Sequence, residues 1–182
     1  QAYCDLENSR ITAATEKFTE LTARKHSDYT APARYAAGYI CYVQKDFSSA
    51  AGWFEKSVKD GRFSKMSNYY MMECRFMMGD HAYVIKNGDA MYDAVPVERR
   101  PHLARIVSES YLVSGDADNA RRFYGLSEVK DEEKSRSDWF YSGSVLYAVK
   151  DYKGAVVAFS KMGERLDSLG QIASYHMGYS YI

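Results

Sequence analysis

Small and aromatic residues recur along this chain at intervals of about 34 residues. Each recurrence is marked by an aspartate, and in three of the four a small residue follows four positions later and an aromatic residue eight positions later. The aspartates are Asp46, Asp80, Asp116 and Asp151, and the following pairs are Ala50 and Phe54, Ala120 and Tyr124, and Ala155 and Phe159. This period predicts pairs of antiparallel helices, each pair packed on the next.

The same pattern locates the helices. In the first complete repeat, we expect a first helix over residues 32–44 and a second over residues 47–59, with Asp46 capping the second. Later repeats begin near residues 65, 101, 136 and 171, and a further second helix is expected over residues 11–24. Gly79 and Gly115 precede the capping aspartate in two of the turns, where glycine best adopts a left-handed backbone. Lys45 and Lys150 occupy this position in the other two turns.

These positions predict one repeat array with six parts. A partial repeat covers residues 1–30, four complete repeats cover 31–64, 65–100, 101–135 and 136–170, and residues 171–182 form the first helix of another repeat. Both ends fall inside helix pairs, so we expect a fragment of a longer array. An apolar C-terminal end would then be exposed, and we expect weak self-association through it.

The small residues have a mechanical role, because two helices approach closely only where one of them carries little side chain. On the first helices these residues are Gly38, Ser108, Gly143 and Gly178, and on the second helices they are Ala14, Ala50, Ala120 and Ala155. The aromatic residues that follow are expected to fill the space where the two helices diverge.

This pattern resembles the tetratricopeptide repeat family. The fourth repeat matches the family best, with Trp139, Gly143, Ala155 and Phe159 at its favoured positions. The resemblance implies an all-α fold in which helix-turn-helix repeats form a right-handed superhelix, an α-solenoid. The second repeat departs from the family pattern: Met72, Val84 and Gly88 stand where glycine, alanine and an aromatic residue are expected. We therefore expect the weakest packing around Val84 and Gly88.

The resemblance also implies a binding surface, because in this family the first helices line a concave groove. A tyrosine there offers rigid contact area with a polar tip, which suits peptide binding. Aromatic residues at helical spacing also occur in cores, so burial is the alternative for these side chains. The predicted peptide-binding groove comprises Tyr35, Tyr39, Tyr69, Glu73, Arg105, Glu109, Phe140, Tyr175 and Tyr179.

Charge and chemistry narrow the function further. Lys plus Arg and Asp plus Glu number 24 each, so the net charge of zero argues against a general nucleic-acid binder. The four histidines form no HExxH pair, and no nucleophile or phosphate-loop motif is present. The three cysteines, Cys4, Cys41 and Cys74, are odd in number and form no CxxC. We therefore predict no catalytic residue, no metal site and no cofactor.

The sequence thus predicts a non-enzymatic scaffold that binds a protein or peptide partner in a Tyr-rich groove. One alternative is a structural spacer or oligomerisation module of a cell-envelope assembly, and another is an RNA-binding helical-repeat protein. The stretch from Asp151 to Phe159 resembles tetratricopeptide proteins of the bacterial cell envelope, many of them in Bacteroidetes. This resemblance implies the periplasm, and the cytoplasm stays open. No apolar run is long enough to predict a membrane span.

Overall fold

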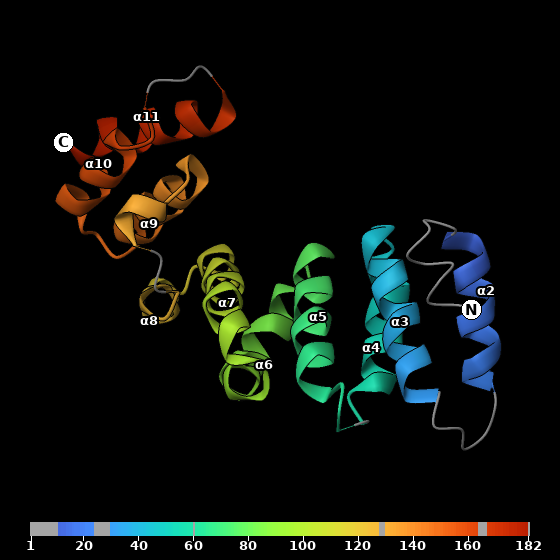
Figure 1. The fold of residues 1–182 in the computed structure, drawn as a ribbon. Helices are drawn as coiled ribbons and strands as arrows, with labels where there is room; N and C mark the ends of the chain where they lie inside the picture. Colours follow the sequence, from blue (N-terminus) through green and yellow to red (C-terminus); the bar gives the residue numbers. More distant parts are fainter. Residues whose placement is uncertain (1–10, 24–29, 60, 128–129, 164–166, 182) are drawn as a thin grey trace. The chain divides into compact units, whose positions relative to one another are not determined.

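The computed structural model describes residues 11–23, 30–59, 61–127, 130–163 and 167–181 (Figure 1). These residues are predominantly helical and contain no strand, which confirms the all-α class. Each helix predicted within these residues is present within a few residues of its expected bounds, and the predicted start of the partial repeat, residues 1–10, lies outside them. The α-helices are α2 (Ile11–Ala23), α3 (Thr30–Val43), α4 (Phe47–Ser57), α5 (Ser64–Met77), α6 (His81–Ala94), α7 (Arg100–Ser114), α8 (Ala117–Gly125), α9 (Arg136–Ala148), α10 (Tyr152–Ser160) and α11 (Ser168–Ser180).

The chain forms two compact units, Gln1–Arg99 and Arg100–Ile182. In the first unit, α2 packs on α3, α3 on α4, α4 on α5, and α5 on α6. In the second unit, α7 packs on α8, α8 on α9, α9 on α10, and α10 on α11. The 3-10 helix η1 (Val97–Arg99) ends the first unit, and η2 (Asp131–Glu133) precedes α9. Packing between consecutive helices is what the sequence period predicts.

The four marker aspartates cap the second helices, as predicted. Asp46 accepts a hydrogen bond from the Ser49 backbone N–H at 3.1 Å, and Asp80, Asp116 and Asp151 make the equivalent bond three residues on. Each bond satisfies an N–H group that the first turn of a helix leaves without a partner. The residue before each aspartate has a positive φ angle. The angles are 62° at Lys45, 75° at Gly79, 81° at Gly115 and 63° at Lys150.

The close approach expected at the small residues is present in two helix pairs. A Cβ atom added to Gly143 would lie 2.5 Å from the Phe159 ring, and one added to Gly38 would lie 2.9 Å from the Phe54 ring. Phe54 and Phe159 are almost fully buried. Each ring thus occupies the space that a side chain on the first helix would need.

The α7/α8 pair differs from the sequence interpretation by one residue. Tyr124, the predicted core aromatic residue, is only half-buried, and its hydroxyl lies 2.6 Å from Ser142 Oγ. The preceding residue, Phe123, is 1% exposed and stacks on Tyr111 with ring centroids 5.8 Å apart. A Tyr hydroxyl requires a polar partner, so the apolar Phe123 fills this core position.

The second repeat forms a helix pair, α5 and α6, despite its unusual residues. Val84 is 0% exposed and Gly88 is also buried. Both residues are therefore buried, while α5 and α6 pack on each other less extensively than the helices of the other complete pairs, which agrees with the predicted weak packing of this repeat.

Each unit contains one of the two tryptophans of the chain. Trp53, on α4, packs against the apolar cluster between α2 and α3, and the Lys56 ammonium lies 4.5 Å from its ring centroid. Trp139, on α9, has two ammonium groups against its ring, from Lys134 at 4.5 Å and Lys161 at 4.2 Å. Asp131 forms an ion pair with each of these two lysines.

Candidate functional site

The predicted binding residues lie on the first helices of the pairs, which are α3 and α5 in the first unit and α7, α9 and α11 in the second. The Asp caps and the left-handed turns fix where the second helix of a pair begins. The α3/α4 and α9/α10 glycines fix how closely the helices of those pairs approach. Each unit therefore presents its own set of first-helix side chains, and the two sets are described separately.

In the first unit, three tyrosine rings form a cluster between α3 and α5. Tyr39 and Tyr70 have ring centroids 5.7 Å apart, Tyr42 and Tyr70 5.0 Å, and Tyr39 and Tyr42 6.4 Å. Tyr39 is 38% exposed, whereas Tyr42 and Tyr70 are half-buried. We call Tyr39, Tyr42 and Tyr70 the tyrosine cluster. The most exposed ring of the cluster is that of Tyr39, which is also the member of the cluster that we predicted as a groove residue from the sequence.

Tyr35 lies at the edge of this cluster and is half-buried. Its ring stacks on Phe63 at 5.1 Å between centroids and meets Phe54 edge-on at 5.9 Å. Tyr35 therefore contributes to packing between α3, α4 and α5 as well as to the surface.

The predicted exposure of Tyr69 is wrong, because this residue is 3% exposed. The end of α6 and the segment after it contact α5 at Asn68 and Tyr69. The Arg99 guanidinium lies 5.2 Å from the Tyr69 ring centroid, and Asn68 donates a hydrogen bond to the Ala94 carbonyl. Burial raises the pKa of Tyr69, and the neighbouring Glu73 raises it further.

Glu73 is half-buried on α5 and lies among tyrosine hydroxyls. The hydroxyls of Tyr42 and Tyr69 lie near enough to its carboxylate for Glu73 to raise the pKa of both. Burial raises the pKa of Tyr42, and the Glu73 carboxylate adds to this increase. The Glu73 Oε2 atom is buried and has no hydrogen-bond partner within the described ranges.

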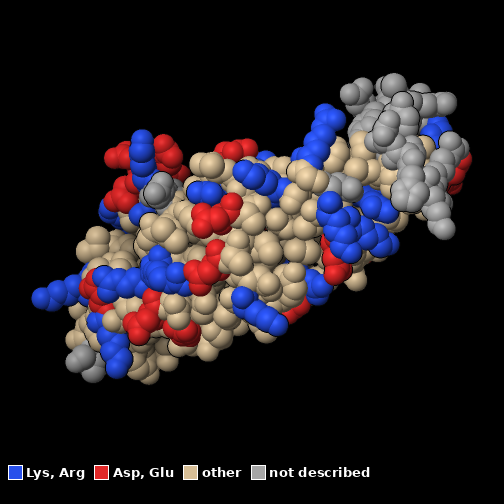
Figure 2. Space-filling model, turned by 90° about the horizontal axis from the view of Figure 1, so that it is seen from below, with Lys and Arg blue, Asp and Glu red and all other residues tan. Residues whose placement is uncertain are grey.

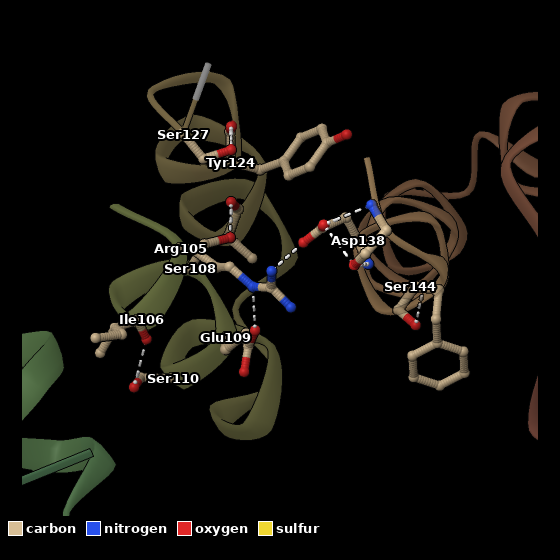
Figure 3. A network of polar contacts seen from close by, with 12 residues as sticks. Arg105, Ile106, Ser108, Glu109, Ser110, Tyr124, Ser127, Asp138 and Ser144 are labelled. Carbon is tan, nitrogen blue, oxygen red and sulfur yellow. Dashed lines mark hydrogen bonds and ion pairs between the residues drawn. The ribbon is translucent and has the colours of Figure 1, made fainter. Parts of the chain in front are cut away.

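In the second unit, Arg105 on α7 joins two carboxylates (Figure 3). Its Nε donates to Glu109 Oε1 at 2.9 Å, and its Nη1 pairs with Asp138 on α9. The guanidinium also lies 5.4 Å from the Tyr141 ring centroid. Burial alone would lower the pKa of Arg105, but Glu109 and Asp138 outweigh burial and raise it. Arg105 and Glu109 are thus near each other, as predicted, and are engaged with one another.

Of the other predicted binding residues in the second unit, Phe140 packs in the core, whereas Tyr175 and Tyr179 are exposed. Phe140 is half-buried and packs in the core cluster of α9, α10 and α11, with its ring centroid 6.0 Å from that of Phe159. Tyr175 and Tyr179, on α11, are 59% and 55% exposed, with ring centroids 4.7 Å apart. A hydrogen bond to Tyr179 raises the pKa of Tyr175. These two tyrosines form an aromatic pair on the surface.

Sequence reasoning missed Asp138, Tyr70 and Arg99. Asp138 was detectable, because Ser135 followed three residues later by an acidic residue is a capping-box pattern, and both reciprocal hydrogen bonds are present. Tyr70 and Arg99 carry no such local signal. Their places follow from packing between helices that the repeat pattern does not specify.

Charges of both signs are interspersed on the face that Figure 2 shows, with broad uncharged areas between them. Within the described ranges, no three His, Cys, Asp or Glu residues form a group that could hold a metal ion. Over the same ranges, no helix has the length and apolar character needed to cross a membrane.

Neither the comparison with protein families nor the comparison with curated proteins finds a match to this chain.

Proposed function

We propose that this chain is a non-enzymatic tetratricopeptide scaffold that binds a peptide or protein partner through the first-helix tyrosines. The proposal includes a right-handed superhelical arrangement of the repeats and a bacterial cell-envelope setting, both based on the resemblance in sequence pattern. One observation carries the binding function. Tyr39, Tyr175 and Tyr179 on first helices are more than one-third exposed, whereas Phe54, Phe123 and Phe159 on second helices are buried.

The chemistry of these side chains supports a peptide partner. Tyrosine gives a large contact area at low cost in side-chain entropy, and its hydroxyl can bond to a peptide backbone. Arg105, the cation expected in the groove, is engaged by two carboxylates and is poorly placed to neutralise phosphates. An RNA partner is therefore the less favoured interpretation.

A structural spacer is the second candidate, and a different observation favours it. Tyr69 and Phe140 turn toward the interior, and Arg105 is paired within the chain, so part of the predicted groove is filled by the protein itself. Weak self-association through α11 belongs to the same interpretation and stays a prediction.

A peptide selection distinguishes the two candidates. The whole chain is used to select binders from a random peptide library, and affinities of the selected peptides are measured for variants with unchanged melting temperature. Loss of contacts at hot-spot aromatic residues predicts that Tyr39→Ala, or Tyr175→Ala with Tyr179→Ala, weakens binding about tenfold or more. The control is Tyr181→Ala, which removes a 77% exposed tyrosine directly after the end of α11.

Two results would contradict the binding proposal. One is a selection that yields no peptide above background, and the other is an equal loss of affinity in the Tyr181→Ala control. Either result favours the spacer. Steep loss of binding between low and moderate salt would instead point to nucleic acid.

A further inference from the structure

The Glu73 carboxylate lies where few hydrogen-bond donors can reach it. It lies half-buried on α5, about one helical turn after Tyr69 and Tyr70, and its charge raises the pKa of Tyr42, Tyr69 and Tyr70. A carboxylate has about four lone-pair positions that need donors. The buried Oε2 atom of Glu73 has no hydrogen-bond partner in the described part of the chain. A buried carboxylate oxygen without a donor is unfavourable, and a donor that also carries positive charge would satisfy it best.

The rings around Glu73 have the chemistry that attracts a cation. The three rings of the tyrosine cluster lie between 5.0 and 6.4 Å from one another, and two pairs are steeply tilted. Tilted aromatic faces around one point can attract a cation through their negative faces. The chain already uses this interaction nearby, because the Arg99 guanidinium lies over the Tyr69 ring.

Two arginines of the first unit, Arg75 and Arg99, interact with groups other than the Glu73 carboxylate. Arg75, on the same helix, forms an ion pair with Asp80 at 3.2 Å and lies over the Tyr83 ring. Arg99 is exposed at the end of η1 and stacks on Tyr69. Within the tyrosine cluster, Tyr70 is affected by both charges, because Arg99 lowers its pKa and Glu73 raises it. At Tyr42, the Glu73 carboxylate adds to the increase in pKa that burial causes. The negative charge of Glu73 beside Tyr42 complements a cation on a partner.

From this placement we propose that Glu73 and the tyrosine cluster bind an arginine or lysine side chain of a partner peptide. The inference rests on the proposed peptide-binding function and names one of its recognition positions. The cation would lie against the rings of the cluster and pair with Glu73 Oε2. Because Oε2 is buried, a ring has to move aside, and Tyr39 is the most exposed of the three.

The test uses the peptides selected by the whole chain. We expect arginine or lysine to be enriched at one peptide position. In a peptide with arginine there, replacement of that arginine by neutral, nearly isosteric citrulline should weaken binding about tenfold. Glu73→Gln keeps the shape of the side chain and removes its charge. In this variant, the citrulline replacement should cost less than about twofold, because the two changes remove the same interaction.

Glu55→Gln is the matched control, since Glu55 is an exposed carboxylate on α4, in the same unit. It should leave the citrulline effect at its full size. If peptides bind but show no cation position, or if Glu73→Gln leaves the citrulline effect intact, the inference is overturned while the binding function stands. A selection that yields no peptide overturns the proposed function itself. The citrulline comparison needs no protein variant, so a folding defect in Glu73→Gln would not block the test.

Discussion

At the scale of single residues, a glycine inside a helix affects stability in two ways. It allows a neighbouring helix to pack closely, and it lowers the helix propensity of its own segment. Gly38 lies against the Phe54 ring, whereas a methyl group added at Gly52, in the same unit, would have no neighbouring atom within 4 Å. Both lie inside helices, where glycine is unfavourable relative to alanine. The two positions therefore separate the packing role of glycine from its helix propensity.

We predict that Gly38→Ala and Gly52→Ala change stability in opposite directions. Gly38→Ala should destabilise the first unit by about 1–2 kcal/mol, because the new methyl group displaces a buried ring. Gly52→Ala should stabilise it by about 0.5–1 kcal/mol through helix propensity alone. Urea denaturation followed by circular dichroism measures both. A stabilising Gly38→Ala would mean that Phe54 can move without loss.

Asp138 provides a prediction of pH dependence. Burial raises the pKa of this carboxyl, but hydrogen bonds from Ser135 and the charge of Arg105 outweigh burial, so its folded-state pKa lies below the usual value of 3.8. A group with a lowered folded pKa stabilises the fold above its unfolded pKa and loses this contribution as pH falls through the folded pKa. We expect the stability of the second unit to fall below about pH 4 partly through Asp138.

The measurement compares thermal melts of the chain and of Asp138→Asn between neutral and acidic pH. The variant should be less stable at neutral pH, and the difference should shrink as the solution becomes acidic. A difference that does not vary with pH would show that Asp138 acts through shape alone.

At the scale of elements, all four turns that end in a capping aspartate have a left-handed backbone conformation at the residue before the aspartate. Two of them use glycine at the left-handed position and two use lysine, at φ angles of 62° and 63°. A lysine in this conformation carries steric strain between its Cβ atom and the backbone, which glycine lacks.

A reciprocal exchange tests this interpretation. Lys45→Gly should stabilise the α3/α4 pair by up to about 1 kcal/mol, and Gly79→Lys should destabilise the α5/α6 pair by a similar amount. Both residues are exposed, so loss of side-chain contacts should contribute little. Equal destabilisation by both changes would show that the Lys45 side chain has a role beyond its backbone angle.

The elements were predictable because their signals are local. Each Asp cap and each left-handed turn residue stands within a few positions of the helix it begins, so the period alone locates the helices. Burial of Tyr69 was not predictable in this way. It depends on Arg99 and Ala94, which lie at the other end of the repeat and reach α5 only after the chain has folded back.

The candidate site was predictable only in part for the same reason. Helical spacing placed Tyr39, Tyr175 and Tyr179 on first helices, and they are exposed. It could not distinguish them from Phe140, which has the same spacing but packs against Phe159. Which aromatic residue turns inward is decided by the neighbouring pair of helices and not by the residue's own helix.

At the scale of the whole molecule, the division at Arg99 and Arg100 predicts that each unit folds by itself. The helices of residues 100–182 pack on one another in sequence, and stability in repeat proteins comes from such neighbouring contacts. We expect the fragment 100–182 to have a helical circular-dichroism spectrum and a cooperative thermal transition. The fragment 1–99 provides the comparison. An unfolded spectrum for both fragments would show that neither unit is stable without the other.

The placement of one tryptophan in each unit has a spectroscopic consequence. Trp53→Phe leaves Trp139 as the only indole, so the fluorescence of this variant reports on the second unit, and Trp139→Phe leaves a reporter of the first. The Trp139 ring lies in the electric field of two ammonium groups held by Asp131, whereas Trp53 faces one. Unfolding removes these fields along with the burial of each ring. The chain thus contains two intrinsic probes, and their emission can show whether the two halves unfold together or in sequence.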